Sequence, residues 1–312
     1  MKIGLDIMGG DFAPEAVVEG AVDSLSHLSG DDKLVLIGDQ DSIHFKLKEL
    51  SCDPSRFEIV HTTQVIGMGD TPSKAYSQKP DSSIAVGYRL LKENRIEGFC
   101  SAGNTGAMLV GASYTVNVIP GVFRPALATV MPVVNNRHAV ILDVGLNPDT
   151  KPDVLLQYGM LGTLFAKYVL EIDNPTVRLL NIGEEASKGT PAVKAAYELM
   201  KEHTEINFLG NIEANEMFGE KSPDVIVCDG FVGNIVLKQT EAFYQIYKAR
   251  NLSDSYFERL NFENIGGTPI VGINANVVIG HGISKRKAIM NMILQTMAVV
   301  HVDLAQKIKE AI

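Results

Sequence analysis

Several features that would identify a common class of protein are missing from this 312-residue chain. It has only three cysteines, Cys52, Cys100 and Cys228, and none forms a CxxC pair. An odd number of isolated cysteines predicts reduced, packed thiols and a cytoplasmic protein. The opening residues MKIGLDIMGGD carry one lysine and no sustained apolar stretch, so we expect no signal peptide. No run approaches the roughly 20 apolar residues that a membrane-spanning helix needs.

Four familiar catalytic or nucleotide-binding motifs are also absent. No GxGxxG follows a predicted strand and no GxxxxGKS or GxxxxGKT occurs, which argues against a dinucleotide-dependent dehydrogenase or a P-loop ATPase. Neither GxSxG nor HExxH is present, so neither a hydrolase nucleophile nor a zinc-protease site is indicated. We therefore expect no cofactor and no metal.

The charge balance is acidic, with a formal net charge of −9. Nucleic-acid binding depends on Lys and Arg neutralising phosphates, so this balance argues against a nucleic-acid partner. The apolar share of 46% and the charged share of 21% are those of a globular protein. The length allows one large domain or two ordinary ones.

Short β-branched runs alternate with helical patterns along most of the chain. This alternation predicts βαβ units and a three-layer α/β/α sandwich, Rossmann-like, with a mostly parallel sheet. The strands Thr129–Val133 and Ala139–Asp143 flank Asn135-Asn136, which predicts a hairpin and hence a mixed sheet. No repeat, low-complexity tract or linker interrupts the chain, so we expect a single catalytic domain over residues 1–312.

Two helical segments near the C-terminus have distinct patterns. Residues 236–262 predict two amphipathic helices joined near Asn251, a helical hairpin within the domain. Its exposed aromatic side chains suit a dimer contact, a membrane contact or packing on its own domain. Residues Ser284–Ile312 predict one long helix.

Five predicted strands end in clusters rich in Gly, Asp, Asn and Ser. In an open α/β sheet, ligands bind outside the carboxyl ends of the strands. Five such ends predict one polar, backbone-rich site, and they favour an enzyme that handles a small, oxygen-rich ligand such as phosphate. The clusters are Gly9-Gly10-Asp11, Ser101–Gly106, Asp143–Asn147, Gly183-Glu184-Glu185 and Asp229–Asn234.

The segment Ser101-Ala102-Gly103-Asn104-Thr105-Gly106 lies between a strand and a predicted helix. Glycines let the backbone approach a ligand, and a helix N-terminus suits an anion. The alternative is an ordinary tight turn with Thr105 near the N-cap. Lys74 and Lys79, in a predicted loop, and Arg124 are cations suited to holding a phosphate, unless they are simply solvated.

Polar residues in the second half of the chain have more than one interpretation. Asp143 and Asp229 follow strands, where a carboxylate orients a ligand, binds a metal or, most often, caps backbone N–H groups. Asn147 and Asn234 are candidates to donate a hydrogen bond to a carbonyl oxygen as charge builds on it. His281, between two glycines, suits proton transfer near neutral pH or is a structural loop histidine.

In their order along nearly the whole chain, these stretches resemble the bacterial phosphate acyltransferases, the PlsX family. The resemblance implies acyl transfer from acyl carrier protein to inorganic phosphate, giving acyl phosphate for phospholipid synthesis. It also implies a fold similar to phosphotransacetylases and to isocitrate and isopropylmalate dehydrogenases, a homodimer, and peripheral contact with the inner face of the membrane. The matching segments are MKIGLDIMGGD (Met1–Asp11) with Pro14, SAGNTG (Ser101–Gly106), RPA (Arg124–Ala126), DVGLN (Asp143–Asn147), NIGEEASKGT (Asn181–Thr190), GNIE (Gly210–Glu213), DGFVGN (Asp229–Asn234), GGTPIVG (Gly266–Gly272) and GHGIS (Gly280–Ser284).

Two places depart from the family pattern. Family members often carry arginine near position 77, where this chain has Ser77, so Lys74 and Lys79 would have to serve in its place. The hairpin around Asn251 is shorter than in many relatives and lacks the long lysine-rich apolar helix associated with membrane contact.

With this resemblance, we expect phosphate to attack the acyl thioester directly, an enzyme task dominated by positioning. The expected catalytic residues are His281, Asn234, Lys79 and Arg124. The expected substrate-binding residues are Gly9, Gly10, Asp11, Lys74, Ser101, Gly103, Asn104, Thr105, Gly106, Asp143, Asn147, Asp229 and Gly233.

Three other functions fit parts of the pattern. A phosphotransacetylase-like enzyme would use acyl-coenzyme A in place of the carrier protein. A non-catalytic scaffold would recruit lipid-synthesis enzymes to the membrane through the aromatic hairpin. A decarboxylating dehydrogenase of similar fold would require a nicotinamide cofactor and a divalent metal.

Overall fold

The computed structural model describes all 312 residues, which form two compact units. The first unit comprises Met1–Ile119 and Phe262–Ala305, and the second comprises Pro120–Asn261 and Gln306–Ile312. This division describes how the chain packs. Whether residues 1–312 fold as a single domain stays a prediction.

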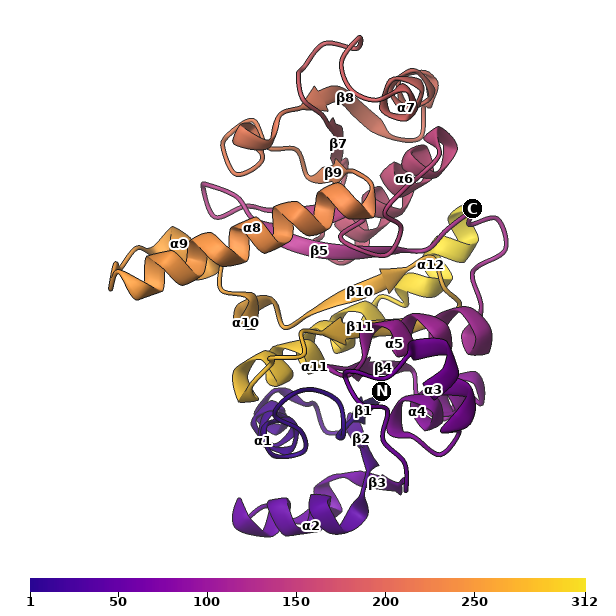
Figure 1. Ribbon diagram of the computed structural model, residues 1–312, viewed down its shortest axis with the longest axis vertical. Coiled ribbons are helices and arrows are strands. Elements are labelled where there is room, and N and C mark those ends of the chain that lie inside the picture. Colours follow the sequence, from indigo (N-terminus) through magenta and orange to yellow (C-terminus); the bar gives the residue numbers. More distant parts are fainter. The chain divides into compact units, whose positions relative to one another are not determined.

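The first unit is a sheet in the order β3-β2-β1-β4-β11-β10, parallel except for β10. Figure 1 shows α1 and α11 on one face of this sheet and α3, α4 and α5 on the other. Because both faces are covered, β1 and β2 are buried at every position after the first, as continuous apolar runs predict. The strands are β1 (Lys2–Asp6), β2 (Lys33–Gly38), β3 (Glu58–His61), β4 (Gly98–Ser101), β10 (Gly267–Val271) and β11 (Asn276–Gly280), and the helices are α1 (Glu15–Ser24), α2 (Gln40–Glu49), α3 (Pro72–Gln78), α4 (Ser83–Lys92), α5 (Thr105–Gly111), α10 (Phe262–Ile265) and α11 (Arg286–His301).

The second unit is a smaller mixed sheet in the order β5-β6-β9-β7-β8. Its strands β6, β9, β7 and β8 are parallel and β5 is antiparallel. Helix α6 packs on β6, β7 and β9, while α8 packs on β6. The elements are β5 (Ala126–Pro132), β6 (His138–Leu142), α6 (Pro152–Tyr168), β7 (Thr176–Leu180), α7 (Pro191–Glu202), β8 (Asn207–Ile212), β9 (Val225–Val227), α8 (Gly230–Ala249) and α9 (Ser255–Arg259); α12 (Leu304–Ala311) follows α11.

The predicted hairpin and mixed sheet are confirmed. Strands β5 and β6 pair antiparallel from Ala128 opposite Leu142 to Pro132 opposite His138. Asn135 and Asn136 at the turn have φ of 59° and 58°, a left-handed conformation that asparagine tolerates better than most residues. The three-layer α/β class predicted from the alternation of elements is therefore present.

Two local predictions were wrong. Residues Ser284–Ile312 are not one helix, because α11 ends at His301, Asp303 adopts a φ of 47°, and α12 begins at Leu304. The segment that carries Lys74 is not a loop but the short helix α3, which starts with Pro72 at its first position, where proline is well tolerated. A helix of seven residues is too short to show a clear period in the sequence.

No single helix is both long and apolar enough to cross a bilayer; only the bent pair α11 and α12 reaches the required length and composition together.

Helices α1 and α11 pack closely at one glycine. A Cβ atom at Gly20 would lie 2.6 Å from Cβ of Ile289 and 2.7 Å from the backbone oxygen of Arg286. The side chain of Ile289 is fully buried, so neither helix has room to move apart without losing core contacts. Gly20 is therefore a packing requirement in the middle of a helix, where glycine is otherwise unfavourable.

We predict that Gly20→Ala lowers the free energy of unfolding by roughly 1–3 kcal/mol, as other insertions into a packed core do. Urea unfolding followed by circular dichroism measures this. Gly30→Ala is the matched control, because nothing lies within 4 Å of a Cβ atom there. Equal stability of the two variants would contradict the packing argument.

Candidate active site

Three neighbouring parallel strands of the first unit, β1, β4 and β11, end at the same edge of its sheet. The loops that follow them contact one another. The backbone N–H of Asp11 donates to the oxygen of Gly282 over 2.8 Å, and a Cβ atom at Gly280 would lie 3.2 Å from Cβ of Ala102. The predicted residues of these three loops are thus brought together in this unit.

A buried carboxylate that the sequence analysis did not select, Asp6, organises this edge. It is 1% exposed at the end of β1. Its Oδ2 accepts a 2.6 Å hydrogen bond from Ser101 Oγ, and its Oδ1 accepts one of 2.9 Å from the N–H of Met8. Burial raises the pKa of Asp6, while hydrogen bonds from Ser101, Ser83 and the backbone oppose the rise. The sequence pattern that could have identified Asp6 is an aspartate at the end of an apolar strand, the same pattern that selected Asp143.

The predicted glycines of the loops after β1 and β4 are required because the two loop backbones approach each other closely. A Cβ atom at Gly9 would lie 2.7 Å from the backbone nitrogen of Gly103, so the loops after β1 and β4 contact each other only because both residues lack side chains. Gly103 N–H donates to Ser101 Oγ over 2.9 Å. Gly10 adopts a φ of 110°, which glycine alone accepts readily.

Asn104, one of the predicted phosphate-binding residues, has a structural role. Its Oδ1 caps α5 by accepting from the N–H of Ala107 over 3.0 Å. Its Nδ2 lies 3.1 Å from the oxygens of Gly67 and Asp70 and 3.3 Å from that of Met68. The side chain therefore fastens the 67–70 loop to the edge.

The first residues of α5 remain accessible. Thr105 is exposed and Gly106 is half-buried, and their backbone N–H groups have no partner within the helix. A side chain at Gly106 would collide with the ring of Pro72, so α3 lies directly against this turn. Backbone donors at this turn are thus available to a ligand.

The two predicted phosphate-binding lysines differ in their environment. Lys79 follows α3, and its Nζ lies 2.6 Å from Asp70 Oδ2 and 2.8 Å from the oxygen of Val65. Lys74 lies within α3, is exposed and has no ion pair. Of the two, Lys74 is the cation whose charge no carboxylate of the chain offsets.

His281 follows β11 at the same edge and is half-buried. Its ring lies 5.5 Å from the ring of Phe262, tilted by 44°. Its Nδ1 accepts from the N–H of Ile283 over 3.4 Å, and its backbone oxygen accepts from Ser284 over 2.8 Å. With Nδ1 as an acceptor, the neutral ring carries its proton on Nε2.

In the second unit, β6, β9 and β7 are neighbouring parallel strands, so their carboxyl ends also meet at one edge. Asp143 is fully buried there. Its Oδ1 accepts from the N–H groups of Leu127, Gly145 and Leu146 at 3.1–3.2 Å. Its Oδ2 accepts from Asn147 through both the backbone N–H, at 2.6 Å, and Nδ2, at 3.1 Å.

These five donors determine the role of Asp143 in this structure. Burial raises the pKa of the carboxyl, and the hydrogen bonds from Leu146, Leu127 and Asn147 act against that rise. Both oxygens are occupied by the chain itself, so Asp143 holds the loop after β6. Asn147 is likewise engaged, because its Nδ2 also donates to the oxygen of Pro125 over 2.8 Å.

The start of α8 packs against this loop through glycines. Asp229 caps the helix by accepting from the N–H of Val232 over 2.8 Å, and Gly230 N–H donates to the oxygen of Asn147 over 2.8 Å. A side chain at Gly233 would collide with the backbone oxygen of Asp143. Asn234, the fifth residue of α8, is exposed, so its amide is accessible to a ligand.

Arg124 is also exposed, and its Nη1 donates to the oxygen of Asp149 over 3.3 Å. The buried side chain of Gln157 holds the preceding turn, since its Oε1 accepts from Phe123 N–H over 2.6 Å and its Nε2 donates to the oxygen of Gly121 over 2.8 Å. Gln157 had no signal in the sequence beyond a polar residue on the buried face of a helix.

A further loop at this edge, residues Asn181–Thr190 after β7, was not selected as part of the site although it matches the family pattern. Asn181 closes it, with Nδ2 donating to the oxygen of Lys188 over 3.1 Å. The buried Asn211 of β8 donates to the oxygens of Glu184 and Glu185. Ser187 and Lys188 are exposed at the tip, and the signal available was a Gly- and Ser-containing segment directly after a strand.

No group of three or more His, Cys, Asp or Glu side chains is arranged to hold a metal ion. Cys100 and Cys228 are buried thiols. Burial raises the pKa of Cys100 to about 12 and that of Cys228 well above its usual value. Such thiols remain protonated at neutral pH and are poor nucleophiles.

Asp143→Asn is predicted to lower the free energy of unfolding by roughly 1–3 kcal/mol, because an amide NH₂ would face donors that have lost their acceptor. Denaturant unfolding at neutral pH measures the effect. Asp229→Asn makes the same chemical change at an N-cap, where asparagine serves as well as aspartate, and we expect a change within about 0.5 kcal/mol. Comparable losses in the two variants would show that the five-donor arrangement does not stabilise the loop.

Asp6 leads to a prediction about pH. Because its pKa is raised in the folded protein, its contribution to stability is fully present below its unfolded pKa of about 4 and is lost as the pH rises through the folded value. Asp6→Asn does not titrate, so the stability of this variant relative to the parent should increase from about pH 4 upward. Urea unfolding of both proteins across this range tests it, and a pH-independent difference would refute the raised pKa.

Comparison with known proteins agrees with the fold and identifies the family. The family model described as fatty acid synthesis protein matches residues 1–307. The chain is 38% identical over 330 residues to the phosphate acyltransferase of Salinibacter ruber, covering 99% of this chain and 97% of that protein. It is 40% identical over 335 residues to the phosphate acyltransferase of Caldicellulosiruptor saccharolyticus, covering 100% and 98%.

Solved structures of similar fold are more distant in sequence. A phosphotransacetylase from Streptococcus pyogenes superposes with a TM-score of 0.70 at 17% identity, covering 96% of this chain and 94% of that one. A 4-hydroxythreonine-4-phosphate dehydrogenase from Klebsiella pneumoniae gives a TM-score of 0.57 at 14% identity, covering 96% and 99%. These likenesses confirm the predicted Rossmann-like fold. With the family match over residues 1–307 and the full-length identity to its members, the chain belongs to the phosphate acyltransferase family and is an acyltransferase.

Proposed function

We propose that this protein transfers a long-chain fatty acyl group from acyl carrier protein to inorganic phosphate, giving acyl phosphate for phospholipid synthesis. The observation that carries the proposal is the 38–40% identity, over essentially the whole chain, to proteins named phosphate acyltransferase. Acyl transfer to phosphate follows from that name. The carrier protein, the chain length and the use of the product are the parts proposed here.

Phosphate binding is assigned to the first unit. The accessible backbone of Ser101–Gly106, with Gly9, Gly10 and Asp11 beside it, offers donors at a sheet edge, and Lys74 offers a charge without a carboxylate partner. Lys79 is proposed to act here as well, although its ion pair with Asp70 must loosen before it can contact phosphate. Phosphate is anionic at neutral pH, so holding it against the thioester is the main requirement and a strong base is dispensable.

The chemical step forms one bond and breaks another. A phosphate oxygen attacks the thioester carbon, the carbonyl oxygen becomes an oxyanion, and the carbon–sulfur bond then breaks. His281, protonated on Nε2, is proposed to stabilise the oxyanion or to give its proton to the leaving thiolate. Asn234 and Arg124 of the second unit are further candidates for oxyanion donors, because both side chains are exposed.

The carrier protein is acidic as a class, so its docking requires a local basic surface on a chain of net charge −9. Lys285 and Lys287, at the start of α11, are exposed, and Nζ of Lys285 lies 5.1 Å from the ring centre of Phe12. We propose this segment as part of the docking surface.

The remaining proposals concern the state of the protein in the cell. Three unpaired cysteines support a cytoplasmic location. The exposed apolar side chains near the start of α8, Phe231, Val232 and Ile235, support a homodimer contact or a peripheral contact with the inner face of the membrane.

The reaction is tested by incubating the purified protein with palmitoyl-acyl carrier protein, with and without phosphate, and trapping acyl phosphate as a hydroxamate. Phosphate-dependent hydroxamate and free carrier protein are expected. Product from acyl-coenzyme A and none from the carrier-protein thioester would favour the phosphotransacetylase-like alternative. If neither donor gives hydroxamate but the protein floats with liposomes, the scaffold alternative would be favoured.

In the same assay, His281→Ala and Lys79→Ala test the assigned roles. Loss of one oxyanion donor typically costs about 10²–10³-fold in rate, so we expect a loss of that size for His281→Ala, and a raised KM for phosphate for Lys79→Ala. His203→Ala, a loop histidine after α7, is the control and should remain normal. Near-normal turnover and phosphate affinity in both test variants would rule out these assignments.

A further inference from the structure

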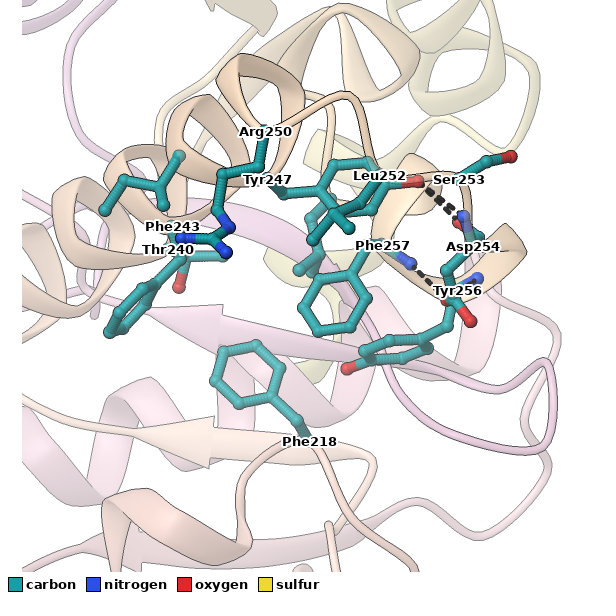
Figure 2. Close-up of a pocket in the computed structure, with 12 residues that line it drawn as sticks. Phe218, Thr240, Phe243, Tyr247, Arg250, Leu252, Ser253, Asp254, Tyr256 and Phe257 are labelled. Atoms are coloured by element: carbon teal, nitrogen blue, oxygen red, sulfur yellow. Dashed lines mark hydrogen bonds between the residues drawn. The ribbon is translucent and has the colours of Figure 1, made fainter.

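An apolar cavity of about 630 Å³ lies where α8 ends and the chain turns into α9 (Figure 2). Its volume is in the middle of the range of about 300–1,000 Å³ that small-molecule sites occupy. Aromatic side chains from three segments face into it, and every lining residue belongs to the second unit. The aromatic residues are Phe218, Phe243, Tyr247, Tyr256 and Phe257.

The walls of this cavity are held in place by their own contacts. Tyr247 stacks on Phe257 with ring centres 5.3 Å apart and planes 19° from parallel, and Tyr256 meets Phe257 edge-on at 5.7 Å. The hydroxyl of Tyr247 donates to the oxygen of Asp254 over 3.2 Å and accepts from its N–H. A cavity with fixed walls binds a ligand without first having to order its side chains.

Two charged groups line the cavity: Asp254, whose Oδ1 accepts from the N–H groups of Tyr256 and Phe257 at the start of α9, and Arg250. Figure 2 shows the guanidinium of Arg250 beside Thr240 and Phe243, at the end of the cavity away from Asp254. Arg250 forms no ion pair, whereas Nζ of the neighbouring Lys248 lies 3.2 Å from Glu258 Oε1. A helix C-terminus favours a cation, which explains the position of Arg250 but leaves its N–H donors available.

The cavity lies apart from the carboxyl edge of the sheet in this unit. Helix α8 begins at Gly230, beside Asp143, and the first of its residues to line the cavity is Thr240, so the cavity begins about 15 Å from that edge. The cavity adjoins the opposite edge, because the hydroxyl of Tyr256 donates to the oxygen of Pro132 over 3.3 Å where β5 ends. It is therefore a separate site.

We propose that this cavity binds an anionic, single-chain lipid, with the alkyl chain against the aromatic walls and the carboxylate or phosphate head on Arg250. The charge supports this occupant, because an unpaired cation beside apolar walls matches a ligand that is apolar along its length and anionic at one end. The acyl phosphate product and a free fatty acid both have this chemistry. Identifying the ligand as acyl phosphate rests on the proposed function, whereas the lipid site itself does not.

Titration calorimetry with dodecanoate and with dodecylphosphonate, both below their micelle-forming concentrations, tests the proposal on the full chain. We expect one saturable site for each, and an affinity that rises by about fourfold for each methylene from eight to twelve carbons. Tighter binding of the phosphonate would identify acyl phosphate as the source, and tighter binding of the carboxylate would identify fatty acid. Absence of saturable binding, or an affinity independent of chain length, would overturn the proposal.

Substitutions in the cavity test separately how the lipid's anionic head group and its alkyl chain contribute to binding. Arg250→Gln should weaken dodecanoate binding by about fivefold, the upper range for an exposed ion pair, and leave dodecanol binding unchanged. Thr240→Phe should weaken both by filling the cavity. Lys248→Gln removes the same charge two residues away, outside the cavity, and should bind like the parent. Equal binding by Arg250→Gln and the parent would exclude the head-group role.

A second copy of the chain is the other candidate occupant. Sedimentation velocity of the Thr240→Phe variant distinguishes a second copy from a lipid. If this variant self-associates differently from the parent but binds dodecanoate equally well, the cavity is an interface between copies and the lipid site is overturned. Because binding needs neither phosphate nor an acyl donor, dodecanoate binding without turnover counts against the proposed reaction alone. Turnover without dodecanoate binding counts against the cavity alone.

Discussion

In each unit, a buried carboxylate at the carboxyl end of one strand holds the loops that form the polar edge. Asp6 does this for the first unit and Asp143 for the second. An ionised carboxyl removed from water is costly unless donors surround it, so the loops must bend to bring N–H and O–H groups to each oxygen. Ser101 supplies one donor to Asp6, and Asn147 supplies two to Asp143. The loop conformations follow from this requirement, and the glycines follow from the loop conformations.

This constraint changes how the polar residues of the edges are interpreted. Asn104, Asp143 and Asn147 look like ligand-binding residues in the sequence, but their side chains are occupied by backbone groups of the chain itself. In the first unit, the backbone at Thr105 and Gly106 and the side chain of Lys74 remain accessible, and in the second unit the side chain of Asn234 does. In the first unit, backbone donors fixed in this way need little reorganisation, which suits the binding of a small anion such as phosphate.

The second unit combines two surfaces of opposite chemistry on one helix. Helix α8 starts at a polar edge through the Asp229 cap and ends at an aromatic cavity beside Arg250. The proposed transfer of a long acyl chain to phosphate requires both a site for a small anion and an apolar environment. The cavity lining on this helix begins at Thr240, about 15 Å from the polar edge, so the two environments remain separate.

The sequence by itself determined the α/β class, the β5–β6 hairpin and the glycine-rich strand ends, because buried strands and asparagine turns leave local patterns. It also determined the family, through the order of short motifs along the chain. Only the tertiary structure decided which polar side chains are used up internally, that Lys79 is paired while Lys74 is not, and that the helix expected over Ser284–Ile312 breaks at Asp303. The physical reason is that hydrogen-bond partners such as Asp6 and Ser101, 95 residues apart, are set by strand adjacency, which no local pattern in the sequence records.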